Sequence, residues 1–498
     1  MAYLAAEKSV VKVIADFVYP NYTRPWMRNE RAAGSGSGFC ISLDVAKLGG
    51  ATPKNSKTST ASSQTKTPKS SKAKKYILTN AHCVLDAIRI FIHRAGTAQN
   101  MPAKVIYIVE ECDLAILETD DAFIKDMPAL TFGGMPKKLS KVYVMGYPLG
   151  GMNMSLTKGA VNRIQIVPYL GFIKGIAIQV DAPINFGNSG GPAVDADGKV
   201  VGVAFYGEDD SKTQNMGYLI PTLIVNYVLD KFTAGLQHRG LADLAIRTQT
   251  ASNAAMRKRY NLKDSDPGLV IVESHVPEIK ENDVLLSIDG ITIDSDSTIL
   301  LKDLISMDTN EVVPWGTITG LRKEGDIVKV GLIRDKKAIT VEAPVRVRKW
   351  GVPYFNYQSP NEYYMLGGLV FVTFSYMYFN ERRAAGDSVQ HLFCILYDSQ
   401  GRDSDRQHVI ISEALDTPLT EGYHHVNHVV HKLNGKSFKS LGEFRKIAAE
   451  VLETKKGYIE LEVLAEGGAS KIVLDVAEVI EQQDQILADN GMRASKML

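Results

Sequence analysis

The chain has 498 residues, which at about 100–200 residues per domain predicts about three domains. Hydrophobic residues make up 45% of the sequence, so each domain can bury a core of ordinary size. The formal net charge is +1, which excludes long-range steering of the whole chain toward nucleic acid or an acidic membrane surface.

The first residues contain no apolar run followed by a cleavage site, so we expect neither a signal peptide nor a transit peptide. The sequence has no run of about 18 apolar residues, which predicts no membrane span. The cysteines are too sparse for a secreted disulfide framework, although a bridge between Cys40 and Cys83 stays open; the others are Cys112 and Cys394. We therefore expect a cytoplasmic protein, unless the N-terminus is processed.

Residues 1–235 contain many short apolar runs, such as YILTNA, KVIYIV and KVVGVAFYG, separated by Gly, Pro and Asn. Such runs predict strands, and their close spacing predicts an all-β barrel or sandwich that ends in a helix near 222–232. Residues 45–75 interrupt the pattern with eight Lys among Ser and Thr. This segment is interpreted as a solvated hairpin insertion, with a basic docking or regulatory loop as the alternative.

Two smaller α+β modules are predicted next, over 236–345 and 346–485, followed by a frayed tail over 486–498. Two pairs of similar runs, GLVIV with GLVFV and LLSIDGITI with VHKLNGKSF, indicate that one module is used twice. Helices are expected over ASNAAMRKRY in the first module and LGEFRKIAAEVL in the second.

Three polar residues of the first domain form a catalytic pattern. Ser189 lies in GNSGG, where glycines allow a tight turn that points the N–H groups of Gly187 and Ser189 toward a developing oxyanion. His82 follows an apolar strand and Asp113 begins another. A serine nucleophile needs a base, and that base needs an acid to fix its tautomer. Each residue alone has an ordinary structural explanation, but the order His, Asp, Ser in one all-β domain predicts a chymotrypsin-like serine endopeptidase.

Several motifs together resemble the HtrA/Deg family of proteases, most of all the plant-type Deg proteases: GSGSGFCIS, ILTNAHCV, ECDLAIL, VMGYPLGG, GNSGGPAV and NMGYLIPT. The resemblance implies an all-β protease domain, a double six-stranded chymotrypsin-like barrel, followed by two small α+β PDZ-like domains. It assigns His82, Asp113 and Ser189 as the triad, and it places the oxyanion hole at Gly187, Asn188 and Ser189. It implies no cofactor.

The same resemblance implies substrates and partners. The family carries out protein quality control, so unfolded or damaged proteins are the expected substrates. A homo-oligomer is expected, as a trimer or a multiple of trimers. By resemblance alone, the segment YPNYTRPW is a plausible trimer contact through Tyr19, Tyr22 and Trp26.

The specificity pocket is predicted to be apolar. Pro183 stands six residues before the nucleophile, where an enzyme selective for basic side chains would need an acid, and Ile184 follows it. We expect an extended substrate to pair with the main chain of the facing strand, at Val203, Ala204 and Phe205.

In the first module, the loop leading into Gly268, Leu269, Val270 and Ile271 is predicted to hold a peptide carboxylate, with the strand beside it accepting the peptide. The parallel run at 367–370 suggests that the second module repeats this device. Four histidines lie close together near the C-terminus, at His424, His425, His428 and His431. They are interpreted as part of a solvated strand, with a metal site as the alternative.

The sequence leaves two other classes of function to consider. One is a chaperone or scaffold in which cleavage is minor, which the complete triad disfavours. The other is a nucleic-acid-associated protein bound through the Lys-rich segment, which the balanced charge and the lack of interleaved aromatic residues disfavour.

Overall fold

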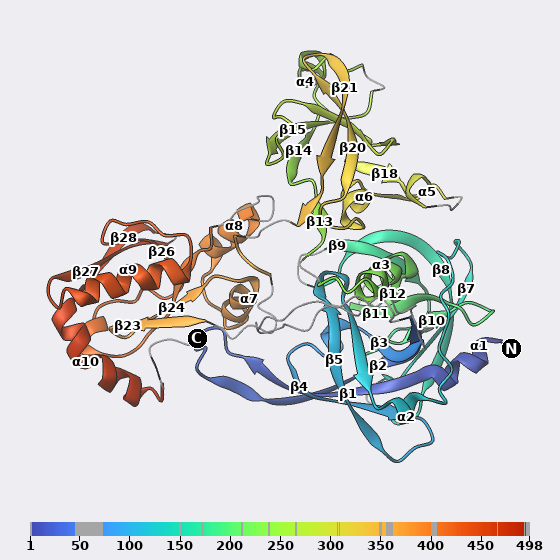
Figure 1. Ribbon diagram of the computed structural model, residues 1–498, viewed down its shortest axis with the longest axis horizontal. Coiled ribbons are helices and arrows are strands. Elements are labelled where there is room, and N and C mark those ends of the chain that lie inside the picture. The colour runs from blue at the N-terminus through green and yellow to red at the C-terminus, as the bar shows by residue number, and fades with distance from the viewer. Residues whose placement is uncertain are drawn as a thin grey trace, which may run out of the picture. The chain divides into compact units, whose positions relative to one another are not determined.

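The chain folds into two compact units, one of residues 1–17 and 32–347 and one of residues 18–31 and 348–498 (Figure 1). This computed structural model describes residues 2–44, 73–148, 151–170, 174–210, 213–237, 240–263, 266–305, 307, 309–347, 351–354, 362–399, 406–465, 467–492 and 494. Most of the Lys-rich segment therefore lies outside the described residues. Within the described part of the chain, no helix is both long and apolar enough to cross a membrane.

Two closed six-stranded barrels make up the first part of the larger unit and confirm the predicted chymotrypsin-like fold. Barrel 1 has the order β1-β2-β3-β6-β5-β4. Its strands are β1 Val10–Pro20, β2 Arg28–Leu43, β3 Lys74–Thr79, β4 Ala87–Arg94, β5 Asn100–Val109 and β6 Leu114–Thr119. Short helices α1 Ala2–Ala5 and α2 Asp121–Ile124 accompany it.

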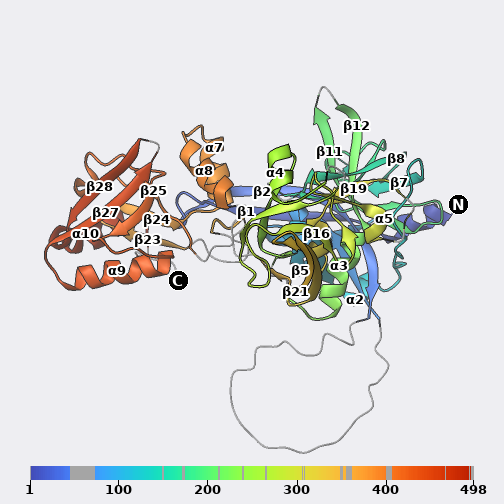
Figure 2. The same cartoon turned by 90° about the horizontal axis from the view of Figure 1, so that it is seen from above.

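Barrel 2 has the order β10-β11-β12-β9-β8-β7. Its strands are β7 Lys141–Gly146, β8 Ser155–Pro168, β9 Lys174–Val180, β10 Pro192–Val194, β11 Val200–Asp210 and β12 Thr213–Pro221. Figure 2 shows β11 and β12 side by side as a long hairpin. The predicted helix is confirmed as α3 Thr222–Thr233, which buries Val225 and Val228 in the core.

The first module is built on a sheet of order β14-β15-β16-β20-β21, with β14 at one edge. These strands are β14 Ile246–Thr250, β15 Leu269–Ser274, β16 Val284–Ile288, β20 Ile327–Arg334 and β21 Lys337–Pro344. Two-stranded pairs form from β13 Ala242–Asp243 with β22 Arg346–Val347 and from β18 Thr298–Leu300 with β19 Val312–Pro314, and β17 Ile291–Thr292 pairs with β16. Its helices are α4 Ala254–Arg259, α5 Leu301–Leu304 and α6 Gly316–Gly320.

The second module has a sheet of order β23-β24-β25-β26-β27-β28. The strands are β23 Tyr363–Leu366, β24 Leu369–Thr373, β25 Val409–Ala414, β26 Val429–Leu433, β27 Tyr458–Ala465 and β28 Gly468–Asp475. The predicted helix is confirmed as α9 Leu441–Glu453, which lies along the sheet in Figure 1. Two helices between β24 and β25, α7 Tyr376–Ala384 and α8 Gln390–Ser399, were not predicted.

The sheet of the second module repeats the strand order of the first with one strand added, but one of the two predicted correspondences is shifted. In the first module the amide of Ile271 donates to Asp283, and that of Asn282 donates to Ile271. In the second module Ile411 and Asn427 make the matching pair of bonds, with His428 in the place of Asp283. The run GLVIV therefore corresponds to β25, and GLVFV on β24 corresponds to β14 instead.

Two further predictions about the C-terminal region are corrected. The tail predicted over 486–498 is not frayed at its start, because α10 Val476–Asp489 runs through the boundary. Ile486 and Met492 are buried. Of the four histidines only His431 lies in β26, since His424, His425 and His428 precede that strand. The alternation expected of a single strand therefore does not hold for them.

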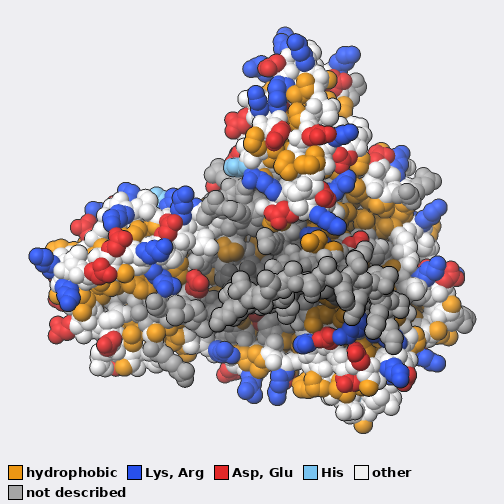
Figure 3. Space-filling view, in the orientation of Figure 1, with side chains coloured by type: hydrophobic (Ala, Val, Ile, Leu, Met, Phe, Trp, Pro, Cys, Tyr) orange, Lys and Arg blue, Asp and Glu red, His pale blue; other side chains and the backbone are white. Residues whose placement is uncertain are grey.

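The cysteines are free thiols, so the possible Cys40–Cys83 bridge is absent. Burial raises the pKa of Cys40 to about 11, which keeps it protonated and unreactive. On the face that Figure 3 shows, Lys and Arg side chains are interspersed with Asp and Glu, in keeping with the balanced net charge.

Candidate active site

Asp113 and His82 form a closely bonded pair in barrel 1. One carboxylate oxygen of Asp113 lies 2.7 Å from Nδ1 of His82, and the other accepts the backbone N–H of His82 at 2.9 Å. The two bonds together fix both the ring and the backbone of the histidine. Nδ1 donates to the acid, so Nε2 is left to act as the base.

The position of Asp113 follows from the local chain. A short 3₁₀ turn, Glu110–Cys112, ends at Asp113, which has the left-handed backbone conformation (φ 49°) that Asp tolerates better than most residues. Its carbonyl accepts a hydrogen bond from the side chain of Asn80 at 2.8 Å. The carboxylate is buried, with 1% of the residue exposed. These contacts hold the acid still beside the histidine.

Electrostatics favour a charged imidazole at this place. Burial lowers the pKa of His82, but the charge and hydrogen bond of Asp113, with a smaller effect of Cys83, outweigh it. The pKa of His82 is therefore well above its usual value. An imidazolium that forms when the base takes a proton is stabilised in the same way.

The predicted nucleophile lies on a glycine-rich turn of barrel 2, where its hydroxyl faces another acceptor. Oγ of Ser189 donates to the carbonyl of Phe205 at 3.3 Å, and among the described residues no hydrogen bond joins it to His82. At 3.3 Å this O–H···O bond is long and therefore weak. Rotation about the Cα–Cβ bond is needed to turn the hydroxyl toward the base, a common situation in unliganded sites.

The turn itself depends on glycine. Gly187 and Gly190 have positive φ values of 97° and 84°. A Cβ on Gly190 would lie 2.1 Å from the carbonyl oxygen of Ser37 and 2.4 Å from Oγ1 of Thr79. The residue is therefore required both for its backbone conformation and for its lack of a side chain.

The predicted oxyanion hole is corrected at one position. The backbone N–H of Asn188 donates to the carbonyl of Asn185 at 3.0 Å, so it does not point toward a substrate. The side chain of Asn188 is buried, with 2% of the residue exposed. Within the described residues the N–H groups of Gly187 and Ser189 have no such acceptor, which leaves these two amides for the oxyanion.

The sequence did not reveal the importance of Ser37, which ties the nucleophile turn to barrel 1. Its N–H donates to the carbonyl of Ser189 at 2.7 Å, and its hydroxyl donates to the carbonyl of Gly187 at the same distance. Its own carbonyl accepts the hydroxyl of Thr79 at 2.7 Å. The thiol of Cys83 is also directed at the carbonyl of Ser189, at 3.6 Å. Only the GSGSG motif, which contains Ser37, could have signalled this role.

Comparison with known proteins agrees with this geometry. Residues 67–203 match the trypsin-like peptidase domain, and residues 352–496 match a PDZ domain. The chain is 30% identical over 446 residues to putative protease Do-like 13 of Arabidopsis thaliana, covering 87% of this chain and 79% of that protein. The chain belongs to the Do-like, or HtrA/Deg, family of serine proteases.

Other relatives extend the comparison. Chloroplastic protease Do-like 2 of the same plant is 30% identical over 440 residues, which cover 87% of this chain and 66% of that protein. A solved structure of a variant of the HtrA-type protease AlgW with a decapeptide superposes with a TM-score of 0.50 at 20% identity, over 70% of this chain and 96% of that one. That likeness supports the fold.

The substrate-pairing strand predicted for this Do-like protease is also corrected. Val203 pairs with Pro192 on one side and Ile220 on the other, so both of its edges are occupied. Ala204 donates to the carbonyl of Gly191 and accepts from Gly190. Phe205, whose carbonyl accepts from Ser189, is the first residue of the predicted set that lies beside the nucleophile.

The predicted pocket residue Ile184 is buried beside Gly217. A Cβ on Gly217 would lie 2.6 Å from the side chain of Ile184, so the isoleucine fills the space that this glycine leaves. No charged side chain is brought in by Pro183 or Ile184, in keeping with an apolar pocket.

The addition of a peptide strand predicted at 268–271 is corrected as well, whereas capture of a carboxylate by the loop leading into these residues stays a prediction. Leu269 pairs with Thr250 on one side and Leu285 on the other, and Val270 is likewise paired on both sides. A peptide cannot add to a strand with both edges occupied. The second module gives the same result at 367–370, because β24 is paired with β23 and β25.

The histidine cluster does not form a metal site among the described residues. The rings of His425 and His428 lie 4.9 Å apart, but no group of three or more His, Cys, Asp or Glu in the described part of the chain could hold an ion.

Proposed function

We propose that this Do-like protease hydrolyses internal peptide bonds of unfolded or damaged proteins, using the Ser189, His82 and Asp113 side chains. The observation that carries the proposal is the double hydrogen bond between Asp113 and His82, together with a turn that presents Ser189 and two amides without an acceptor among the described residues. Together they supply a nucleophile, an oriented base and an oxyanion hole.

The reaction follows from these groups. Oγ of Ser189 attacks the carbonyl carbon of the substrate while Nε2 of His82 takes the hydroxyl proton. The N–H groups of Gly187 and Ser189 bind the oxyanion that forms. The histidine then gives the proton to the leaving amine, and a water molecule, deprotonated in the same way, hydrolyses the acyl-enzyme.

The first module supplies a place for the tail of a substrate. Its strand β14 is at the end of the sheet order, so one edge of the strand has no strand partner among the described residues. An extended peptide can add there by main-chain hydrogen bonds. This edge replaces the site predicted at 268–271, and it would raise the local concentration of a substrate near the active site.

Digestion of casein by the wild type and by Ser189→Ala, with the product termini sequenced, tests the proposal. We expect cleavage by the wild type only, after small or medium aliphatic residues, because Pro183 and Ile184 bring no charge to the pocket. One methylene changes such preferences by about 1–3 kcal/mol, so selectivity should be broad. Equal cleavage by the variant would refute the function, and product termini dominated by Lys or Arg would refute the apolar pocket.

Hydrogen exchange of the full chain with an excess of a free peptide that has an apolar C-terminus tests the first module. We expect added protection in Ile246–Thr250 and none in Leu269–Ser274. Protection confined to the second of these strands, or to neither, would contradict capture at β14. The homo-oligomer expected for this chain stays a prediction, for which light scattering of the purified protein is the direct test.

A further inference from the structure

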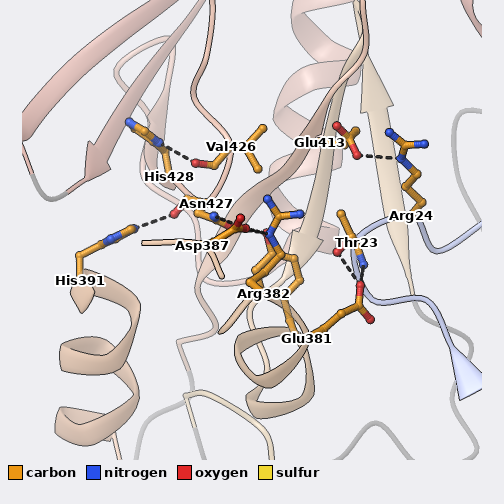
Figure 4. A network of polar contacts seen from close by, with 11 residues as sticks. Thr23, Arg24, Glu381, Arg382, Asp387, His391, Glu413, Val426, Asn427 and His428 are labelled. Atoms are coloured by element: carbon orange, nitrogen blue, oxygen red, sulfur yellow. Dashed lines mark hydrogen bonds and ion pairs between the residues drawn. The ribbon is translucent and has the colours of Figure 1, made fainter. Parts of the chain in front are cut away.

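The connection between the first two strands of barrel 1 belongs to the C-terminal unit. Residues 18–31 join β1 to β2, yet they fold with the second module (Figure 4). There they bind Glu381 of α7, whose carboxylate accepts the backbone N–H of Tyr22 at 2.9 Å and that of Thr23 at 3.1 Å. The hydroxyl of Thr23 donates to the same carboxylate at 2.5 Å. We call residues 18–31 the strap.

Two more contacts hold the strap to the sheet of the second module. Nε of Arg24 lies 2.8 Å from the carboxylate of Glu413 on β25. The ring of Trp26 packs against Tyr363 of β23, with centroids 5.6 Å apart. Thr23 is buried, with 8% of it exposed, so the three hydrogen bonds to the Glu381 carboxylate are partly shielded from water. Hydrogen bonds to a charged acceptor are the strong ones in such surroundings.

Glu381 lies on α7, which forms a platform together with α8 between β24 and β25. Between the matching strands of the first module, β14 and β15, the described residues form only the short helix α4. The buried side chain of Asn427 holds this platform to the sheet. It accepts from the hydroxyl of Tyr378 on α7 at 2.7 Å and donates to Asp387 at 3.2 Å, and its carbonyl lies 2.8 Å from Nε2 of His391 on α8. Asp387 also pairs with Arg382. Helix α7 is therefore fixed, and Glu381 with it.

The other end of the strap leads to the nucleophile. Strand β2 starts at Arg28, within the strap, and continues to Leu43 in barrel 1. It carries Ser37, which donates to the carbonyls of both Ser189 and Gly187. One strand therefore connects the Glu381 contact to the turn that forms the oxyanion hole.

The second module has no open strand edge at the position that corresponds to β14. Its strand β24, the counterpart of β14, is covered by β23, in which Tyr364 pairs with Phe371 and Leu366 with Leu369. Tyr364 and Leu366 are buried. The strand edge that is open on β14 in the first module is thus occupied by β23 in the second. The contact that the second module makes through Glu381 is with the strap.

We propose that the second module binds the strap through Glu381 in order to position β2 and, through Ser37, the oxyanion hole. The module then acts on the rate of catalysis and does not capture substrate. This inference rests on the proposed protease function, because it concerns the same nucleophile turn.

The test is a double-mutant cycle in the full chain, with a short fluorogenic peptide as substrate so that capture by the modules does not contribute. We expect Glu381→Ala to raise the amide exchange of Tyr22 and Thr23 at least tenfold. We expect kcat to fall about fivefold, the low end of ordinary coupling between sites, with KM unchanged. Glu381→Gln, which keeps one acceptor oxygen, should give a smaller change of the same sign and serves if the alanine variant does not fold. The control is Glu421→Gln, at an exposed glutamate of the same module.

The second arm of the cycle is Ser37→Ala, which should lower kcat without changing exchange in the strap. In that background Glu381→Ala should lower kcat less than it does in the wild type, because the bond from the Ser37 hydroxyl to Gly187 is already lost. A kcat equal to the wild type in Glu381→Ala, or effects of the two variants that simply multiply, would overturn the inference. A wild type that does not cleave the peptide at all would instead refute the proposed function, while the exchange data would still report on the strap.

Discussion

The catalytic residues of barrel 1 are already in their working arrangement, whereas the nucleophile in barrel 2 is not. In barrel 1, Asp113 holds His82 by two hydrogen bonds of 2.7 and 2.9 Å, and the acid is almost completely buried. In barrel 2, Ser189 makes a single 3.3 Å bond to Phe205, which is not its catalytic partner. The base is therefore in place before a substrate arrives, whereas the nucleophile must still rotate.

This difference indicates where the site is adjustable. A buried carboxylate cannot leave its partners cheaply, so the pair in barrel 1 has essentially one arrangement. A serine hydroxyl in a long, weak bond changes rotamer at small cost. Contacts that hold the nucleophile turn, such as those of Ser37, are thus better placed to tune activity than contacts around the histidine.

Removal of the nucleophile gives the largest expected effect. Ser189→Ala should lower casein cleavage about a million-fold, to the level left by binding and the oxyanion hole. Its unfolding midpoint should equal that of the wild type, because the hydroxyl makes only one weak bond. Residual cleavage within tenfold of the wild type would mean that barrel 2 does not supply the nucleophile.

Removal of the charge in barrel 1 comes next. Asp113→Asn keeps the size of the side chain but favours the wrong tautomer of His82, and in chymotrypsin the equivalent change costs about 10⁴ in kcat. We expect a loss of similar size here, measured on a peptide substrate, with KM little changed. A loss of kcat of less than tenfold would contradict the view that Asp113 holds His82 in its catalytic orientation.

The pH dependence of kcat/KM checks the cause of that loss. His82 acts as a base only when neutral, and its pKa is raised because the attraction of Asp113 outweighs burial. Wild-type activity should therefore disappear as the pH falls through this raised pKa. In Asp113→Asn the acidic limb of the profile should move to lower pH. A limb at the same pH in both proteins would contradict the role given to the carboxylate.

A smaller effect is expected in the turn of barrel 2. Gly190→Ala forces a side chain into a left-handed conformation, which costs on the order of 1–3 kcal/mol, and pushes a Cβ against the carbonyl of Ser37. Urea unfolding should show a loss at least this large, together with a fall in kcat. Gly134→Ala, where a Cβ would meet no neighbour within 4 Å, is the matched control. Equal free energies of unfolding for the two variants would show that the turn can rearrange to accept a side chain at residue 190.

The smallest effect is expected at Cys83. Its thiol approaches the carbonyl of Ser189 at 3.6 Å and is a weak donor. Cys83→Ser should leave kcat within about threefold of the wild type, because a hydroxyl can donate to the same carbonyl. A much larger loss would mean that the contact between the barrels depends on the thiol.

The sequence was sufficient for the triad and the barrels because each depends on local patterns. His82 follows a short apolar strand, Asp113 begins one, and Ser189 lies between glycines, all of which are visible in the chain. The strand runs predicted an all-β barrel or sandwich, and the resemblance implied the double barrel, which is confirmed. The orientation of a single backbone N–H group cannot be predicted from such local sequence patterns. The resemblance placed Asn188 in the oxyanion hole, but its amide turns back to Asn185.

The peptide sites were misplaced for a related reason. Leu269 and Val270 form a clear apolar strand, yet no local pattern shows whether a strand lies at the edge or the middle of a sheet. That property depends on pairing with residues distant in sequence, here Thr250 and Leu285. Tyr22 and Trp26 lie against Glu381 and Tyr363 of the second module, which no local pattern indicated, and the trimer contact expected of them by resemblance stays a prediction. Oligomerisation and the cytoplasmic location stay predictions.

The most direct test of the account is covalent labelling of the wild-type protein with a fluorophosphonate at pH 8, followed by peptide mapping. Such a probe reacts with a serine only when a base activates it and an oxyanion hole receives the product oxygen. We predict one adduct per chain, on Ser189, which is strongly reduced in Asp113→Asn. An adduct on another serine, or none while the protein is folded, would contradict the assignment of Ser189, His82 and Asp113 as the catalytic triad.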